Sequence, residues 1–109
     1  MWIVTSPRPG IVHLEFDGGD ALDTANAAEA KTSALAAISG AKQAAVDLAP
    51  VEFIDSSGLS VLVAIYKSAR ARGARLRFHG VRPGVRAVLE IIRLDRIFEI
   101  TDDAVEARG

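Results

Sequence analysis

Hydrophobic and polar positions along this chain change period several times, and each period predicts a type of element. Alternating or β-branched runs typical of strands occupy residues 2–4, 11–16, 44–48, 75–79 and 98–101. Apolar residues recur at helical spacing over residues 24–39, 59–72 and 83–92. Asp23 or Thr24 is expected to cap the first helix, because a short side-chain oxygen can accept the free N–H groups of a first turn.

The order of these segments predicts an α/β sandwich. Pro7, Pro9 and Gly10 separate the first two strands, which we expect to form a hairpin. The later strands alternate with helices, and right-handed crossovers would make those strands parallel. The sheet is therefore expected to be mixed, with the strand at 44–48 in its centre.

Composition narrows the function classes. The chain has 109 residues, half of them apolar and a quarter charged, which suits one globular domain over 1–109 with a polar tail from about residue 102. It has no cysteine, which excludes disulfides, thiolate metal sites and Cys nucleophiles. A net charge of −1 argues against a nucleic-acid binder. No apolar run is long enough for a membrane span and the first residues lack a signal peptide's features, so we expect a cytoplasmic protein.

Charge is divided unevenly between the two halves of the chain. Residues 1–60 carry three basic and eight acidic groups, a net of −5, whereas residues 61–109 carry ten basic and six acidic groups, a net of +4. The two halves can complement each other within one domain, or they can form a field that steers a partner.

The segment Phe53-Ile54-Asp55-Ser56-Ser57-Gly58-Leu59-Ser60 is the most unusual in the chain. It leads into the second predicted helix, where Asp55, Ser56 and Ser57 could act only as capping residues. The positive end of a helix also tolerates a phosphoryl group, so the same segment could be a modification site. Its local chemistry leaves both interpretations open.

This segment, continued by Val61 and Leu62, resembles the signature of STAS-domain anti-sigma factor antagonists, an apolar pair followed by Asp-Ser-Ser/Thr-Gly-Leu-Gly and an apolar helix. The resemblance extends over about residues 10–101 and implies a single STAS-like domain, with a mixed sheet of four to five strands and helices mainly on one face. Two features depart from the family pattern. Ser60 stands where the family commonly has Gly, and the stretch 19–25 has one extra residue relative to the family's Gly-Glu-Leu-Asp element.

The resemblance implies a partner-switching protein that is not an enzyme. Members of the family bind a serine kinase that is an anti-sigma factor, or a separate one, and they release it when the kinase phosphorylates them. A PPM-type serine phosphatase resets them. The acceptor is usually the hydroxyl residue before the Gly, which is Ser57 here, with Ser56 as the fallback.

We expect the partner to dock where the loop around Asp23 and Thr24 meets the first turn of the second helix. The residues expected to bind the partner are Asp23, Thr24, Asp55, Ser56, Gly58, Ser60 and Val61. Gly58 would let the partner's backbone approach closely, so that a Gly58→Arg change would block binding at little cost in stability. That helix is more apolar than one core face needs, so Val61 or a neighbour is expected to stay exposed.

Two other functions compete with this one. A STAS adaptor subunit of a transport complex would keep the fold without phosphorylation. An enzyme would need a base beside Ser57, yet the only histidines, His13 and His79, lie in no recognisable triad context, and each is expected to face solvent or a satisfied neighbour. The sequence indicates no metal site and no cofactor.

Overall fold

The predicted alternation of strands and helices is confirmed in the computed structural model, which describes residues 1–101. The predicted polar tail from residue 102 lies outside the described residues. The elements, in chain order, are β1 (Trp2–Arg8), β2 (Ile11–Phe16), β3 (Ala21–Leu22), α1 (Ala27–Ala37), β4 (Gln43–Asp47), β5 (Phe53–Ile54), α2 (Ser56–Ala71), β6 (Arg75–His79), α3 (Pro83–Ile91), the short 3₁₀ helix η1 (Leu94–Arg96) and β7 (Ile100–Thr101).

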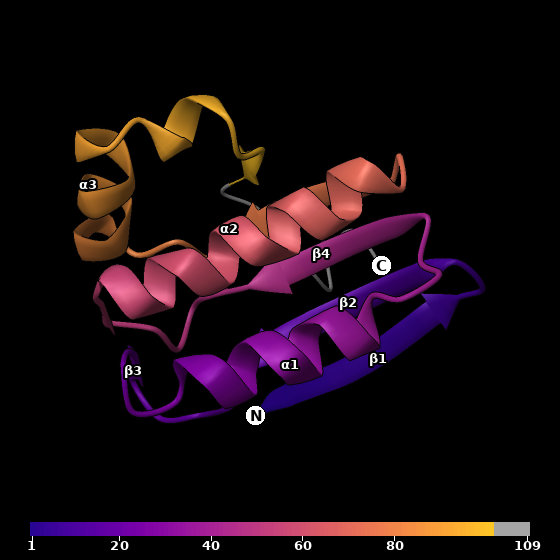
Figure 1. Ribbon diagram of the computed structural model, residues 1–109, viewed down its shortest axis with the longest axis horizontal. Helices are drawn as coiled ribbons and strands as arrows, with labels where there is room; N and C mark the ends of the chain where they lie inside the picture. The colour runs from indigo at the N-terminus through magenta and orange to yellow at the C-terminus, as the bar shows by residue number, and fades with distance from the viewer. Residues whose placement is uncertain (102–109) are drawn as a thin grey trace.

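The main sheet is mixed, as the sequence predicts. Its five strands lie in the order β1-β2-β4-β6-β7, so β4 is central. β1 and β2 form the predicted antiparallel hairpin, and the pairs β2–β4, β4–β6 and β6–β7 are parallel. Figure 1 shows α1 and α2 lying side by side across one face of this sheet, with α3 drawn above the N-terminal part of α2.

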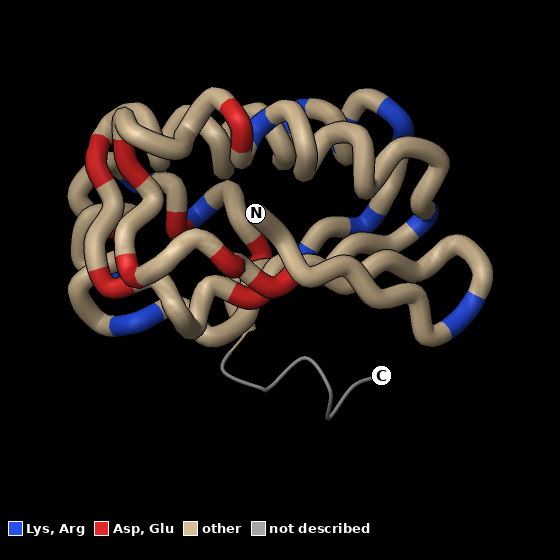
Figure 2. The backbone as a smooth tube through the Cα atoms, turned by 90° about the horizontal axis from the view of Figure 1, so that it is seen from below, with Lys and Arg blue, Asp and Glu red and all other residues tan. Residues whose placement is uncertain are grey.

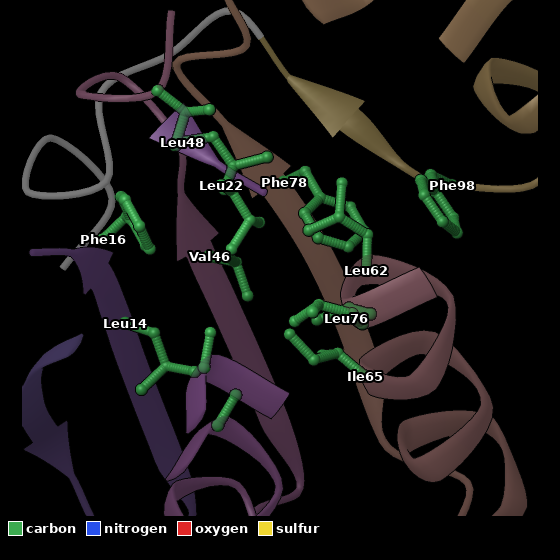
Figure 3. Close-up of a cluster of buried hydrophobic side chains, with 14 of the residues drawn as sticks. Leu14, Phe16, Leu22, Val46, Leu48, Leu62, Ile65, Leu76, Phe78 and Phe98 are labelled. Atoms are coloured by element: carbon green, nitrogen blue, oxygen red, sulfur yellow. The ribbon is translucent and has the colours of Figure 1, made fainter. Parts of the chain in front are cut away.

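The core lies between that sheet face and the two long helices. Inward-facing strand residues such as Leu14, Val46 and Phe78 are almost fully buried, as are Leu62 and Ile65 of α2. Figure 3 shows the two α2 side chains pointing from the helix toward the strand residues. Burial alternates over the second half of β2, whereas the central strand β4 buries three consecutive residues and the edge strand β1 is largely exposed. Alternation predicts a strand with one solvent-facing side, and a short apolar run predicts a strand that is covered on both sides.

Several element boundaries differ from the prediction. β1 continues past Pro7 to Arg8, with a register shift between Thr5 and Arg8; a proline is tolerated here because β1 is an edge strand. α1 begins at Ala27 rather than Thr24, and α2 begins at Ser56 rather than Leu59. The small parallel sheet of β3 and β5 was not predicted, because two-residue strands carry too little alternation to be recognised.

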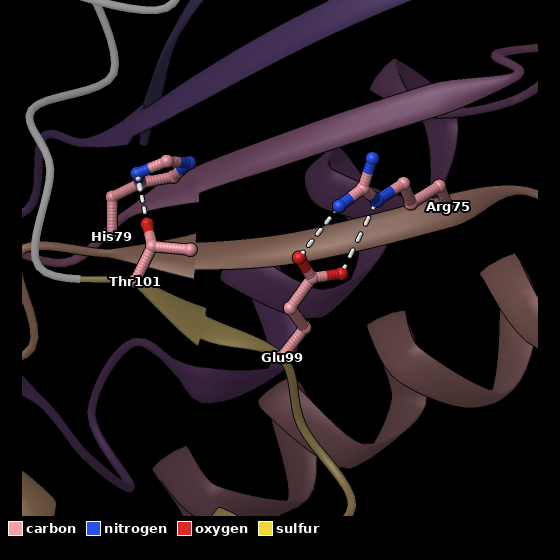
Figure 4. A network of polar contacts seen from close by, with 4 residues as sticks. All are labelled: Arg75, His79, Glu99 and Thr101. Atoms are coloured by element: carbon pink, nitrogen blue, oxygen red, sulfur yellow. Dashed lines mark hydrogen bonds and ion pairs between the residues drawn. The ribbon is translucent and has the colours of Figure 1, made fainter.

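β7 is shorter than its predicted range, because Phe98 packs into the core instead of pairing in the sheet. Two side-chain contacts join β6 to the segment that contains β7 (Figure 4). Arg75 Nη2 lies 2.8 Å from Glu99 Oε2, and His79 Nδ1 lies 2.6 Å from Thr101 Oγ1. His79 is 1% exposed and lies beside this hydroxyl, so it does not face solvent.

Candidate functional site

The small sheet of β3 and β5 brings together two segments that are about thirty residues apart in the chain. Ala21 pairs with Phe53 and Leu22 with Ile54, and each strand is followed at once by a predicted site residue, Asp23 or Asp55. The Asp55 backbone N–H donates to the Leu22 carbonyl at 3.4 Å. The structure therefore places the Asp23–Thr24 loop beside the start of α2, as expected from the topology.

Asp55 connects these two segments through both of its carboxylate oxygens. Oδ1 accepts the backbone N–H of Gly58 at 2.9 Å, which caps α2. Oδ2 accepts both the backbone N–H and the hydroxyl of Thr24, each at 3.1 Å. The hydrogen bond from Gly58, helped by those from Thr24, lowers the pKa of Asp55 although burial opposes the shift, so this carboxyl is ionised at neutral pH.

The two adjacent serines at the start of α2 have different surroundings. Ser57 is half-buried, and its Oγ lies 3.1 Å from Thr24 Oγ1. Ser56 is exposed, and its hydroxyl makes no hydrogen bond within the described part of the chain. Ser60, one turn later, is exposed and donates its hydroxyl to the Ser57 carbonyl at 2.7 Å. Of the three hydroxyls, only that of Ser57 contacts the Asp23–Thr24 loop.

The turn before α1 is organised differently from the prediction. The N-cap residue is Asn26, and no side chain makes a capping hydrogen bond there, so the prediction of a cap by Asp23 or Thr24 is wrong. Asp23 Oδ1 accepts the Ala25 N–H at 3.0 Å within the turn. Asn26, which the sequence analysis overlooked, accepts the Asp23 N–H at 3.0 Å and donates to the Ala21 carbonyl at 2.8 Å. These local bonds leave the Thr24 side chain available for Asp55 and Ser57.

Two residues predicted to face a partner are instead part of the fold. Val61 is 1% exposed and lies in the core, so it forms no docking patch. Gly58 is buried, and a Cβ built on it would lie 2.1 Å from the Leu22 carbonyl oxygen. A side chain at this position would separate α2 from β3, so the expectation that Gly58→Arg costs little stability is wrong. Phe53, whose exposure was not predicted, is an apolar residue beside the site that is 57% exposed.

The Ser57 hydroxyl has no histidine as a hydrogen-bond partner within the described residues. It contacts Thr24, and neither His13 nor His79 is among its hydrogen-bond partners. Over residues 1–101, no cluster of three or more His, Asp or Glu side chains is placed to hold a metal ion. None of the helices in that range combines the length and apolar character that a membrane crossing needs.

Charge is distributed asymmetrically around this site. In Figure 2 the Asp and Glu positions gather in the half of the molecule that holds β3 and the start of α2, where Lys and Arg positions also occur. The opposite end carries only Lys and Arg among its charged positions in that view. The candidate site therefore lies in the half of the molecule where the acidic positions gather.

Comparison with known protein families finds one domain that covers nearly the whole chain. The model of the STAS domain matches residues 3–107. Two relatives, each named anti-sigma-B factor antagonist, come from Listeria monocytogenes and Listeria innocua and are 36% identical to this chain over 64 residues. That match covers 59% of this chain and 56% of each relative, so it spans only a little over half of their length.

Solved structures have the same fold over almost the full chain. An anti-sigma-factor antagonist domain protein from Planctomyces limnophilus superposes with a TM-score of 0.83 at 23% identity, covering 97% of this chain and 93% of its own. The anti-sigma factor antagonist SpoIIAA of Bacillus has been solved unphosphorylated and phosphorylated, and each form gives a TM-score of 0.76. Their identities are 15% and 17%, with 99% of this chain and 94% and 96% of theirs covered.

Proposed function

This chain belongs to the STAS domain family, and we propose that it is an anti-sigma factor antagonist that works by partner switching. In its unphosphorylated form it binds a serine kinase that is itself an anti-sigma factor or acts beside one. Phosphorylation of Ser57 by that kinase releases it, and a PPM-type serine phosphatase restores the binding form. The protein thus acts by binding rather than by catalysis, in the cytoplasm where the kinase finds ATP.

The observation that carries this proposal is the position of Ser57 among its neighbours. Its hydroxyl lies in the first turn of α2 and contacts the Thr24 hydroxyl, which also donates a hydrogen bond to Asp55. The residue is half-buried rather than enclosed, so a kinase can approach it. The two Listeria relatives are named as antagonists of an anti-sigma factor, which supports the same class of partner for this chain.

Release follows from the charge that a phosphate would add at this point. A phosphoserine carries about −1.5 to −2 charges and three acceptor oxygens. At Ser57 that charge would lie close to the ionised Asp55, within whatever interface the kinase forms there. Burying an unpaired charge in an interface costs several kcal/mol, and about 1.4 kcal/mol already lowers affinity tenfold, so a weakening of a hundredfold or more is expected.

Phosphate mapping tests the proposal directly. The purified chain is incubated with ATP and candidate serine kinases from its own cell, and the products are analysed by intact mass and peptide mapping. We expect one phosphoryl group at Ser57, none in Ser57→Ala, and unchanged modification in Ser56→Ala. Modification confined to Ser56 would overturn the residue assignment. A chain that no candidate kinase modifies would favour an adaptor subunit of a transport complex.

Calorimetric titration with the kinase then tests whether charge at Ser57 controls binding. Ser57→Ala should bind as tightly as the unmodified chain, whereas Ser57→Asp should bind more weakly. The Asp effect is expected to be partial, because one carboxylate has less charge and fewer acceptor oxygens than a phosphate. Ser39→Asp, at an exposed serine just after α1, is the matched control and should bind normally. Equal affinities for Ser57→Asp and the control would contradict a charge-controlled interface.

A further inference from the structure

The Thr24 hydroxyl lies between Asp55 and Ser57, and it has only one proton to donate. Its Oγ1 is 3.1 Å from Asp55 Oδ2 and 3.1 Å from Ser57 Oγ. The ionised carboxylate of Asp55 can only accept, and hydrogen bonds to a charged acceptor are the stronger kind. The Thr24 hydroxyl therefore donates its hydrogen bond to Asp55, and the Thr24 oxygen must accept a hydrogen bond from the Ser57 hydroxyl.

This proton count gives the Ser57 hydroxyl a defined orientation. Its proton points to Thr24, so its lone pairs are directed away from the Asp23–Thr24 loop. A half-buried serine without such a partner could rotate among its staggered positions. Thr24 thus fixes the direction of the proposed acceptor oxygen, although it lies 33 residues earlier in the chain.

Phosphorylation would change the proton count at this contact. The transfer forms a bond between Ser57 Oγ and the γ-phosphorus of ATP, breaks the bond to ADP, and passes the Ser57 proton to a base on the kinase. The resulting ester oxygen has no proton to donate, so the existing hydrogen bond from Ser57 to Thr24 cannot persist. The phosphate oxygens, joined to Oγ through phosphorus, can come within reach of the Thr24 hydroxyl, whose oxygen lies 3.1 Å from Oγ in the unmodified chain.

We propose that Thr24 is a positioning residue for Ser57. In the unmodified chain its oxygen accepts a hydrogen bond from the Ser57 hydroxyl. In the phosphorylated chain its own hydroxyl stops donating to Asp55 and donates to the phosphate. This inference rests on the proposed function only for the identity of the modified residue. Asp55 would keep the backbone N–H groups of Gly58 and Thr24, so the cap of α2 survives the exchange. The change is confined to one hydroxyl.

The test uses the full chain with phosphoserine encoded genetically at position 57, so that no kinase is needed. Thr24→Val removes the hydroxyl while retaining the backbone N–H that Asp55 also accepts. Thr24→Ser restores a hydroxyl, and Thr24→Ala is a second deletion in case the valine variant folds poorly. Thr32→Val is the matched control, because that exposed hydroxyl bonds the Ala28 carbonyl within α1. NMR titrations follow the Asp55 carboxyl by ¹³C and the phosphate by ³¹P.

The expected results differ between the two forms of the chain. Without phosphate, Thr24→Val should raise the pKa of Asp55, because a donor to its charged form is lost. With phosphate, the same substitution should leave the Asp55 pKa unchanged. It should raise the second pKa of the phosphate, ordinarily about 6, so that the ionisation constant falls at least roughly twofold. Thr24→Ser should restore both values, and Thr32→Val should alter neither.

Either of two results would overturn the inference. One is a phosphate pKa that is the same with Thr24 and with Val at that position. The other is an Asp55 pKa that still responds to Thr24→Val after phosphorylation, which would show that the hydroxyl never leaves the carboxylate. A failure of every kinase to modify Ser57 would instead count against the proposed function alone.

Discussion

At the scale of single residues, Asp55 and Ser57 have different contacts, which their spacing alone does not reveal. The sequence leaves two interpretations of the Asp-Ser-Ser segment open, a helix cap and a modification site. Asp55 is indeed the cap of α2, and its side chain bonds Gly58. Ser57 is distinguished from Ser56 by a contact with Thr24, which lies too far away in the chain for any local pattern to indicate.

The lowered pKa of Asp55 predicts a pH-dependent contribution to stability. Its folded-state pKa lies below the ordinary 3.8, so the carboxylate stabilises the fold above that pH, and the contribution disappears as pH falls through the folded value. Asp55→Asn should therefore lower the free energy of unfolding at pH 7, with the difference shrinking below about pH 4. Urea denaturation at pH 7 and pH 3 measures it.

Asp17→Asn serves as the control for that comparison, because Asp17 is exposed and has no side-chain hydrogen bond to a described residue. Its effect on stability should be small at both pH values. A loss in Asp55→Asn that is as large at pH 3 as at pH 7 would show that the ionised carboxylate is not what stabilises the cap.

Gly58 is predicted to stabilise the fold by letting α2 approach β3, rather than to let a partner's backbone come close. Gly58→Ala would place its Cβ 2.1 Å from the Leu22 carbonyl oxygen and 2.7 Å from Ile54 Cγ1, so β3 must move. The expected loss is about 1–3 kcal/mol of unfolding free energy, typical of overpacking. Gly84→Ala, whose Cβ would meet nothing nearer than 3.9 Å, should be neutral or stabilising by up to about 1 kcal/mol. Thermal and urea unfolding measure both variants, and equal losses of stability in Gly58→Ala and Gly84→Ala would contradict the prediction.

At the scale of elements, the strength of a repeating pattern decided what could be predicted. α2 and β6 carry many alternating or periodic positions, and they lie close to their predicted ranges. β3 and β5 have two residues each, so neither shows a period, and their pairing was not predicted. Yet this pairing is what aligns Asp23 and Thr24 with Asp55. The neighbourhood of the site was therefore predictable from topology, whereas its hydrogen bonds were not.

Packing rather than the ion pair is predicted to attach the segment that leads into β7. Phe98 is 5% exposed, and its ring centroid lies 4.8 Å from that of Phe78 and 5.5 Å from that of Tyr66. Phe98→Ala should cost about 3–5 kcal/mol of unfolding free energy. Arg75 and Glu99 are largely solvent-exposed, so Glu99→Gln should cost less than about 1 kcal/mol, with the loss diminished by salt. Urea unfolding compares them, and a reversed order would contradict this ranking.

At the scale of the whole molecule, the site combines nearby acidic residues with a helix whose later turns are buried in the core. The candidate residues lie in the half of the molecule where the acidic positions gather (Figure 2), so a phosphate at Ser57 would add to nearby charge of the same sign, that of Asp55 included. The support for these residues is the buried part of α2, from Val61 to Ala69, which packs on the sheet.

Phosphorylation at Ser57 is therefore predicted to leave the global fold stable. The phosphate lies in the first turn of α2, where the helix dipole favours a negative charge by about 0.3–1 kcal/mol, and this gain opposes the repulsion from Asp55. A chain with phosphoserine encoded at 57 should melt within a few degrees of the unmodified chain. Phosphoserine at 39, just past the C-terminal end of α1, is the matched comparison and should lower the melting temperature more, because the dipole there repels negative charge. Calorimetry measures the melting temperature of both chains. A larger drop with phosphoserine at 57 than at 39 would mean that the modification acts by unfolding the start of α2. Release of the partner would then need no charge repulsion at the interface.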